Sequence, residues 1–462
     1  MSGIRLRIRE IEAFERPMRF ARPFRFGLVT VDEAPQAFVR VVVEVEGAGT
    51  ATGVTAEMMM PKWFDKNPAK SPQDTIANLK ASLSEAARSY AQAGDWDTAF
   101  GHHARGFSAQ KMWAVDHGLP GLVASFGPAL IDKAVADALL KASGIGFAEG
   151  LRRNVFGIDA RQTPDLAEDL IRSFLSGVHP VGDVLLRHTV GLLDSLDGAG
   201  GLEDEIRLAN LRLFKIKIGG DVDADIARLA AIHDLLSRHV PDYRATLDAN
   251  EQYDPQRLRV LLQAMSGGVL RAFRDHLLYI EQPFDRAGTF AAPLDDLSGE
   301  IPFIIDEADG DYDAFPRAVA LGYRGVSSKA CKGFYKSVLN AVRVSALNEA
   351  HQAKFFVSAE DLTCQAGLGI QQDTALVATL GLTHAERNGH HYVEGFGPAP
   401  DAEAARFAAA HPDLYRKQGG RVGLAFERGS LPTASLLSAP GFASGAEPDW
   451  SSLVPLAQHH RS

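Results

Sequence analysis

Five charged side chains in the middle of the chain have the types and spacing of an acid–base site. They are Lys217, Asp248, Glu281, Asp306 and Lys329. Each lies at or near the end of a short apolar run, and successive members are 23 to 33 residues apart, the length of one strand–helix unit. In a barrel of parallel strands, the carboxyl ends of the strands meet at one mouth, where active sites are built. The spacing therefore predicts two lysines and three carboxylates around one mouth.

The three carboxylates predict a bound cation, because like charges that converge on one point repel one another. All-oxygen ligation favours Mg²⁺, with Mn²⁺ as a compatible substitute, over zinc. Asp248, Glu281 and Asp306 are the predicted ligands. A helix N-cap or a surface salt bridge is the ordinary alternative for any one of them, but it explains the three acids together less well.

The tripeptide Lys215-Ile-Lys217 places both lysines on one face of a strand, since side chains alternate with a period of two. Two cations held close together and partly desolvated favour neutrality, which predicts a lowered pKa for at least one of them. Lys217, nearer the strand end, is the better candidate base. Lys329 is expected to approach from the opposite side of the barrel, so a substrate at the mouth meets a lysine on each face. A solvated pair on an edge strand is the alternative for Lys215 and Lys217.

These residues require a scaffold of alternating strands and helices, and the sequence offers eight candidate strands after about residue 181. They are 184–190, 213–218, 243–248, 277–281, 302–306, 325–329, 355–358 and a weak one at 383–386. Such alternation is typical of parallel βαβ units, and eight of them close into a barrel. The predicted fold class is α/β, a (β/α)7β TIM-type barrel with an α+β capping domain.

The capping domain is expected from the N-terminal region and the C-terminal tail. Residues 4–46 alternate or run apolar like strands, and the first ten residues lack the apolar core and cleavage site of a signal peptide. From residue 71 to about 150 the chain is alanine-rich and helical in period. We expect a capping domain over 1–180, a barrel over 181–397, and a segment over 398–462 that returns to the cap.

Composition narrows the classes of partner. The 462 residues carry a formal net charge of −10, which disfavours nucleic acid and anionic membranes. No apolar run approaches the roughly 18 residues of a membrane span. With only Cys331 and Cys364, a disulfide framework is excluded and a reducing cytoplasm is the expected location. A small-molecule carboxylate is the expected partner, and a homo-oligomer is compatible with the sequence.

The motifs in order resemble those of the enolase superfamily, most closely its mandelate racemase/muconate lactonizing enzyme family and the muconate-lactonizing-enzyme-like subgroup. They cover about half the chain: Lys215-Ile-Lys217, Leu247-Asp-Ala-Asn250, Ile280-Glu-Gln-Pro283, Ile305-Asp-Glu307 and Ser328-Lys-Ala-Cys-Lys332. The resemblance implies that Asp248, Glu281 and Asp306 bind Mg²⁺, that Lys217 and Lys329 form the acid–base pair, and that Lys215 tunes Lys217. The implied chemistry is removal of a proton α to a carboxylate through an enediolate.

Within this chemistry three functions stay open. A racemase or epimerase is the leading hypothesis, because lysines on both faces allow a proton to leave from one side and return from the other. A lyase or cycloisomerase, by syn-dehydration or muconate-type lactonization, needs only one acting lysine. A catalytically silent ligand-binding barrel is the third, and the retention of both lysines and all three acids argues against it.

The sequence also predicts which residues lie near the metal ligands and which contact the substrate. Asn250 shares parity with Asp248, and Glu307 follows Asp306, so both are expected behind the metal ligands. Lys332 and Lys336 are interpreted as surface lysines.

Two N-terminal loops are expected to close the mouth of the barrel. At the eighth strand His384-Ala-Glu386 replaces the Asp-x-Asp of dipeptide epimerases, and this difference disfavours dipeptide substrates. The substrate-binding candidates are Phe26, Met59, Trp63, Glu360, Asp361 and Glu386, although methionine and aromatic clusters more often only pack.

Overall fold

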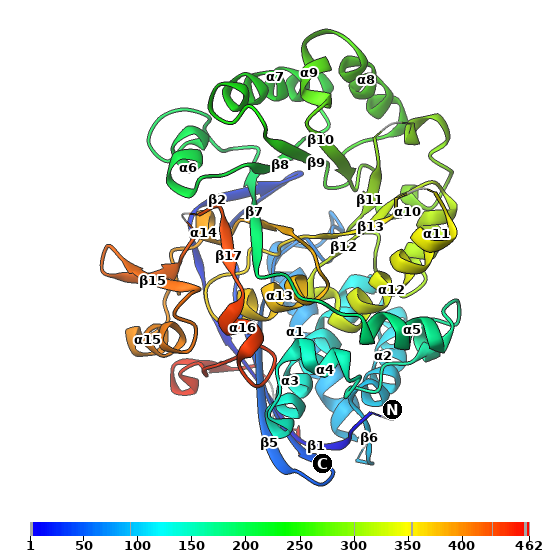
Figure 1. Cartoon of the computed structure of the whole chain (residues 1–462), viewed down its shortest axis with the longest axis vertical. Helices are drawn as coiled ribbons and strands as arrows, with labels where there is room; N and C mark the ends of the chain where they lie inside the picture. The colour runs from blue at the N-terminus through cyan, green and yellow to red at the C-terminus, as the bar shows by residue number, and fades with distance from the viewer. Residues whose placement is uncertain are drawn as a thin grey trace.

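The computed structural model describes residues 3–92, 94–299, 301–352, 354–426, 428–456 and 460–461. It shows an antiparallel sheet with its helices beside a larger closed parallel sheet (Figure 1). Both termini lie at the end of the molecule that carries the antiparallel sheet. The domain boundaries suggested by the sequence stay a prediction.

The N-terminal sheet is built from long strands that alternate in burial. Its order is β18-β1-β4-β5, with β1 (Arg5–Arg16), β4 (Gln36–Val45), β5 (Gly49–Met58) and β18 (Val454–Pro455). The short strands β6 (Asp97–Thr98) and β19 (His460–Arg461) also pair with β1. Between β4 and β5 the chain turns through Gly47 and Gly49, whose φ angles of 76° and 81° suit glycine.

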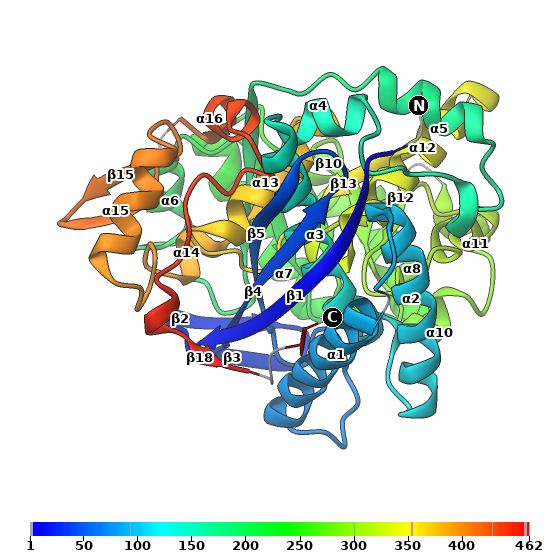
Figure 2. The ribbon, with the colours of Figure 1, turned by 90° about the horizontal axis from the view of Figure 1, so that it is seen from below.

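Helices cover one face of this sheet (Figure 2). They are α1 (Pro72–Gln92) and α3 (Gly121–Ser143), and α2 (Ala99–Asp116) packs against both of these helices. Farther along the chain lie α4 (Phe147–Arg152), η1 (Ala160–Gln162) and α5 (Glu168–Ser176). Nearly every side chain of α3 is buried, because this helix is covered on several sides rather than on one. Gly53 faces α3, and a Cβ there would lie 2.0 Å from the Ala134 carbonyl oxygen, so the sheet and helix approach closely only with glycine.

The parallel sheet confirms the predicted barrel. Its strands are β7 (Asp183–Val190), β8 (Leu213–Lys217), β9 (Arg244–Asp248), β10 (Leu277–Glu281), β11 (Phe303–Ile305), β12 (Gly325–Ser328), β13 (Phe356–Ala359) and β14 (His384–Arg387). Pairing of β14 with β7 closes the ring. All eight expected strands are present, with ends shifted by at most one residue.

The connections between barrel strands are mostly helical, as a parallel sheet requires. The longer ones are α6 (Leu202–Ala209), α7 (Val222–His239), α8 (Pro255–Ser266), α11 (Ala314–Ala320), α12 (Phe334–Ala350) and α13 (Leu368–Thr379). Shorter pieces are α9 (Arg271–Arg274), α10 (Arg286–Thr289), α14 (Gly389–Tyr392), η2 (Gly268–Leu270), η3 (Asp295–Ser298) and η4 (Ala330–Lys332). Asp221 and Asp254 cap α7 and α8 through backbone N–H groups.

The C-terminal residues contact both sheets. They form α15 (Asp401–Ala410), β15 (Tyr415–Gln418), β16 (Arg421–Leu424), β17 (Ser430–Pro432), α16 (Ala434–Ser438) and η5 (Trp450–Ser452). Strand β17 adds antiparallel to β7 on the outside of the barrel, and β18 pairs with β1 of the cap. The tail therefore links the two sheets.

A β-hairpin separate from the main sheets extends from the cap to the barrel. It consists of β2 (Arg19–Phe26) and β3 (Val29–Glu33). Tyr392 of α14 packs on Phe24 of β2 with ring centroids 4.4 Å apart, and Arg22 donates to the Gly200 carbonyl at 3.0 Å. These contacts hold the hairpin against loops at the carboxyl ends of the barrel strands.

Candidate active site at the barrel mouth

The ammonium of Lys215 lies at the centre of a buried cluster of carboxylates. Its Nζ is 2.7 to 2.9 Å from one oxygen each of Asp248, Glu281, Glu360 and Glu386. Burial disfavours the charged lysine, but these four carboxylates outweigh burial and raise its pKa well above the ordinary value. The Lys-x-Lys pair predicted a lowered pKa for at least one of its lysines, and Lys215 is not that lysine, because its nearest charges are acids from four other parts of the barrel.

Lys217 lies closer to the barrel mouth than Lys215. Its Nζ donates to Asp248 Oδ2 at 2.6 Å and to Asn250 Oδ1 at 3.0 Å, and it lies 5.9 Å from the centroid of the Phe24 ring. The register of β8 with β9 pairs Lys217 directly with Asp248. The strand alignment itself thus places this lysine between a carboxylate and an aromatic ring.

Lys329 reaches the mouth from the far side of the barrel. Its Nζ donates to Asp306 Oδ2 at 2.6 Å and lies 4.3 Å from the centroid of the Trp63 ring. Burial disfavours its charge, yet Asp306 outweighs burial and raises the pKa of Lys329. Both Lys217 and Lys329 therefore pair with a carboxylate from the neighbouring strand and contact an aromatic ring from the cap.

Lys332 and Lys336 are not surface residues. Their side chains are buried, and both pair with Asp309, at 3.0 and 3.2 Å. Lys332 Nζ also lies 3.3 Å from Asp306 Oδ1. The surface interpretation was wrong because η4 and the first turn of α12 fold inward against the strand-five loop, which the local sequence does not reveal.

The three acids occupy neighbouring positions at the strand ends. Glu281 pairs in register with Asp248 on one side and with Ile304 on the other, and Asp306 follows two residues after Ile304. In the described part of the chain, neither oxygen of Glu281 accepts a hydrogen bond, although Lys215 Nζ is 2.8 Å from Oε2. Burial, and then the charges of Asp248 and Glu360, raises the pKa of Glu281 well above its usual range. A buried carboxylate that shares a single nearby lysine with three other carboxylates fits a cation ligand.

The other two acids are already paired with lysines. Burial disfavours the charge of Asp306, but Lys329 and Lys332 outweigh it and hold the pKa of this carboxyl well below its usual range. Asp248 is contacted by Lys215 and Lys217. Carboxylate oxygens from these three acids suit a shared dication. If such an ion bound, it would take the place of some of the lysine contacts to Asp248 and Asp306.

Glu307 and Asn250 lie behind this cluster. Glu307 Oε1 accepts from Lys66 Nζ at 2.9 Å and from Asn250 Nδ2 at 3.0 Å. Lys66 belongs to the loop after β5, so Glu307 ties the cap to the barrel. Asp306, in contrast, faces Lys329. This division agrees with the parity argument that assigned Asp306 to the mouth.

Arg187 is a buried charge that the sequence reasoning missed. From β7 it forms an ion pair with Glu360 and donates to the Ala359 carbonyl at 2.8 Å. Its parity with Thr189, which donates to Glu386 at 2.8 Å, places both side chains inside the barrel. The signal available was an arginine directly after the apolar run Val184-Leu-Leu186 of a predicted barrel strand. Glu360, expected to contact substrate, is instead held by Arg187 and Lys215.

Lys217 and Lys329 line one small cavity of about 20 Å³. The other lining residues are Phe24, Phe26, Met60, Trp63, Asn250, Asp361, Leu362, Thr363, Glu386 and Asn388. Four substrate-binding candidates, Phe26, Trp63, Asp361 and Glu386, are thus brought together. Met59 and Glu360 lie outside this lining, while Phe24 and Met60 belong to it and were not anticipated.

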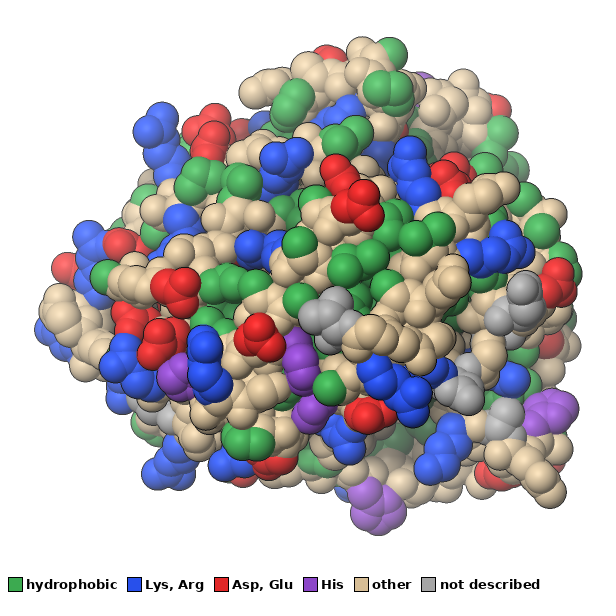
Figure 3. All heavy atoms as spheres, turned by 90° about the horizontal axis from the view of Figure 1, so that it is seen from above, with side chains coloured by type: hydrophobic (Ala, Val, Ile, Leu, Met, Phe, Trp, Pro, Cys, Tyr) green, Lys and Arg blue, Asp and Glu red, His purple; other side chains and the backbone are tan. Residues whose placement is uncertain are grey.

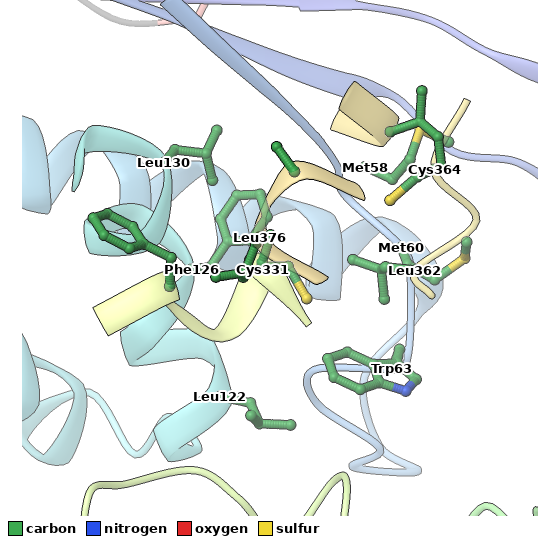
Figure 4. Close-up of a cluster of buried hydrophobic side chains, with 14 of the residues drawn as sticks. Met58, Met60, Trp63, Leu122, Phe126, Leu130, Cys331, Leu362, Cys364 and Leu376 are labelled. Carbon is green, nitrogen blue, oxygen red and sulfur yellow. The ribbon is translucent and has the colours of Figure 1, made fainter. Parts of the chain in front are cut away.

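The roof of the cavity is continuous with the hydrophobic core between cap and barrel. Figure 4 shows Met60 and Trp63 beside Leu362, with Met58 and Cys364 close by. All five are buried. Residues of the loop after β5 therefore pack the core and cover the lysines at the same time, so packing and contact with the site are not exclusive alternatives.

A closed parallel barrel with lysines and carboxylates at its strand ends, covered by loops of a separate cap, defines a capped (β/α)-barrel protein with its site at the barrel mouth. The model of the family described as "Enolase C-terminal domain-like" matches residues 202–414. Over this stretch, 213 of the 462 residues, the chain is similar to the enolase superfamily. The resemblance inferred from the ordered motifs is confirmed.

Solved structures with the same fold cover almost the whole chain. A dipeptide epimerase from Enterococcus faecalis, complexed with Mg and the dipeptide L-Leu-L-Tyr, is 16% identical with a TM-score of 0.63, over 95% of this chain and 99% of that one. An enolase from Bradyrhizobium complexed with magnesium and mandelic acid is 17% identical, with a TM-score of 0.62 and 97% coverage of both chains. A muconate lactonizing enzyme from Pseudomonas fluorescens, complexed with muconolactone, is 18% identical, with a TM-score of 0.59 over 96% and 98%. At these identities the likeness shows the fold.

The sequence matches none of the curated proteins with which it was compared. Within the described residues, none of the helices combines the length and apolar character needed to cross a membrane. On the face drawn in Figure 3, acidic and basic side chains are interspersed among hydrophobic ones.

Proposed function

We propose that this protein catalyses Mg²⁺-dependent abstraction of a proton α to a substrate carboxylate, and that it is a racemase or epimerase. The observation that carries the proposal is that Lys217 and Lys329, from opposite sides of the barrel, line the same cavity. A proton removed by one amine can then be replaced by the other on the opposite face of the α-carbon. Mn²⁺ is a compatible substitute for Mg²⁺.

Asp248, Glu281 and Asp306 would hold the ion. Its contribution, when bound, is to neutralise negative charge that develops on the substrate carboxylate as the α-proton leaves. The position of Glu281 supports this assignment, because its oxygens accept no hydrogen bond from the described residues and it shares Lys215 with three other carboxylates.

The lysines would divide the proton transfer between them. Lys217 Nζ removes or returns the proton on one face, and Lys329 Nζ does so on the other. Asn250 Oδ1, 3.0 Å from Lys217 Nζ, orients that amine. Phe24 and Trp63 cover the two amines and exclude water from the site.

The walls of the cavity restrict the substrate. Asp361 accepts three backbone N–H groups, those of Leu362, Cys364 and Asn388. Glu386 accepts from Thr189 and Lys215. Because these oxygens already accept hydrogen bonds from the protein, neither carboxylate is well placed to bind an ammonium group of a substrate. We therefore propose a carboxylate without an α-ammonium group, such as an N-acyl amino acid or a hydroxy acid, with an apolar substituent against Phe26 and Met60.

Hydrogen–deuterium exchange tests the reaction. The protein is incubated with Mg²⁺ in D₂O with N-acyl amino acids, hydroxy acids and cyclic dienoates, and the mixtures are followed by NMR. Loss of an α-proton signal without net conversion is the expected result. Net loss of water or ring closure would assign a lyase or a cycloisomerase instead.

Replacement of each lysine separates their roles. Lys217→Ala and Lys329→Ala should each abolish racemization, with a loss of about 10² to 10⁴ for the proton transfer concerned. Each variant should still exchange the α-proton of the one enantiomer that its remaining lysine faces. Lys354→Ala, at an exposed position, is the control. The proposal fails if no carboxylate exchanges in the wild type, or if both variants retain full activity.

A further inference from the structure

A second group of potential metal ligands lies outside the barrel interior. It consists of His188 on β7, Glu205 on α6 and His390 on α14. One donor atom from each side chain lies within 4.8 Å of the other two, and in the described part of the chain this is the one such group of three. The three residues come from elements that meet only in the folded protein.

Three of the four imidazole nitrogens of this group have no hydrogen-bond partner among the described residues. His188 Nδ1 and both ring nitrogens of His390 are buried, and none of them has a hydrogen bond to any described residue. The side chain of His188 is only 2% exposed. Buried polar groups are normally paired with protein or water, so two adjacent histidines with unpaired nitrogens, beside a carboxylate, indicate a ligand.

We propose that His188, Glu205 and His390 form a binding site for a borderline transition-metal dication, with Zn²⁺ as the ion of choice. Two imidazoles and one carboxylate are a ligand set found in zinc sites with one open position. Zinc–ligand bonds of about 2.1 Å place tetrahedral ligands about 3.3 Å apart. The donor atoms therefore need to approach by at most about 1.5 Å, which side-chain rotation can supply.

The protonation states of the three ligands suit a metal at neutral pH. Burial lowers the pKa of His188 to about 4 and that of His390 to about 3, so both rings are neutral. Burial opposes the charge on Glu205, but hydrogen bonding from His391 outweighs it and lowers its pKa to about 2. No proton has to be removed from these residues before an ion binds.

A supporting contact orients the carboxylate. His391 Nδ1 lies 3.1 Å from Glu205 Oε1, and its other nitrogen faces Asp194 and Arg22. Burial opposes protonation of His391, but its bonds to Asp194 and Glu205 outweigh burial and raise its pKa. Partners behind the ligands fix ligand geometry in known metal sites, and His391 takes that position here.

The site has a route to solvent. His390 is partly exposed and lines a surface cavity of about 480 Å³ together with Phe426, whose ring packs on it at 4.5 Å. An ion can therefore reach His390 without passing through the barrel mouth.

The proposed zinc site is distinct from the lysine site and lies on the other face of β7. His188 points outward, whereas its neighbours Arg187 and Thr189 face the barrel interior. Residues next to His390 contact the β2–β3 hairpin, through Tyr392 on Phe24 and His391 with Arg22. A metal ion bound by residues of β7, α6 and α14 would therefore stabilise α14, which contacts the β2–β3 hairpin.

Metal binding by the full-length protein tests this inference. The protein is stripped with a chelator, saturated with Mg²⁺, and titrated with Zn²⁺ by calorimetry, with metal analysis after gel filtration. We expect one tightly bound zinc per chain and a zinc-dependent rise in Tm. His390→Gln should weaken binding by at least tenfold and abolish the rise in Tm, while its metal-free Tm should match the wild type, since His390 forms no hydrogen bond to the described residues.

Two further variants locate the binding. Glu281→Gln, in the other carboxylate cluster, and His117→Gln, at an exposed position, should both retain the zinc equivalent. Cobalt bound in place of zinc should give the visible absorption of a four-coordinate ion, and His188→Gln should remove it. Absence of zinc binding in the wild type, or zinc affinity at the wild-type level in both the His390 and His188 variants, would overturn the inference.

Discussion

At the scale of single residues, the site is governed by buried charges that compensate one another. Lys215 contacts four carboxylates, and Arg187 and Lys332 each neutralise part of the same cluster. Such groups are costly to bury alone and tolerable only when paired. Glu281 is the least compensated of these acids, because neither of its oxygens accepts a hydrogen bond from the described residues and it shares Lys215 with three other carboxylates.

Glu281→Gln should therefore separate metal binding from folding. The metal-free protein should unfold at nearly the wild-type temperature, because Lys215 keeps its contacts with Asp248, Glu360 and Glu386 when an amide of the same shape replaces Glu281. The rise in Tm on adding Mg²⁺ should disappear, with affinity reduced by more than the about 10- to 100-fold typical of residues behind metal ligands. Thermal unfolding with and without Mg²⁺ measures both quantities.

Glu349→Gln is the matched control, because Glu349 is exposed on α12 and should leave the Mg²⁺ response unchanged. An undiminished Mg²⁺ shift in the Glu281 variant would remove this carboxylate from the ligand set.

At the scale of elements, the β2–β3 hairpin decides access to the lysines. The cavity of about 20 Å³ has room for about one water molecule, so a substrate enters only when the cover moves. The cover is the hairpin together with the loop after β5. The hairpin turns in two residues, Gly27 and Leu28, and Gly27 has a φ of +51°, a conformation that costs little only for glycine.

Gly27→Ala should loosen the hairpin without unfolding the barrel. The left-handed conformation costs an alanine about 1 to 2 kcal/mol, and the new Cβ would lie 2.8 Å from Gln252 Nε2. Amide hydrogen exchange over residues 19–33 should accelerate by about five- to thirtyfold, while the barrel strands keep wild-type rates. Mass spectrometry of the exchanged protein resolves the two regions.

Gly182→Ala serves as the comparison, because a Cβ at Gly182 meets no atom within 4 Å. Equal exchange of the hairpin in both variants would show that the turn does not control its opening.

At the scale of the whole molecule, one buried carboxylate joins the cap to the C-terminal tail. Asp137 on α3 accepts from the backbone of Val54 on β5 at 2.9 Å and from the backbone of Phe442 at 2.8 Å. It also accepts from Ser444 Oγ at 2.7 Å and pairs with Lys141 at 2.8 Å. Segments separated by about 300 residues thus depend on one side chain.

Asp137→Ala should destabilise the molecule by about 3 kcal/mol, because two buried N–H groups and a hydroxyl lose their acceptor. The measurement is the free energy of unfolding in urea. Asp116→Ala, at an exposed position of α2, should change it by less than about 0.5 kcal/mol. A loss as small as that of the control would mean that water replaces Asp137 as acceptor.

The sequence by itself predicted the eight barrel strands and the positions of Lys217, Asp248, Glu281, Asp306 and Lys329 at their ends. These features are local, because strand propensity, side-chain parity and the spacing of strand–helix units are all written in adjacent residues. The resemblance to the enolase superfamily was inferred from the same residues, taken in the order in which they occur along the chain. Placing Asp306 rather than Glu307 at the mouth also needed only the alternation along one strand.

The tertiary structure alone decided which charges pair and what covers them. Four carboxylates from different parts of the barrel raise the pKa of Lys215 well above its ordinary value, and Lys332 turns inward although no adjacent residue requires it. His188, Glu205 and His390 become neighbours only because β14 closes on β7. Electrostatic and packing energies depend on distance in space, and those distances arise when the barrel closes and the cap docks on it.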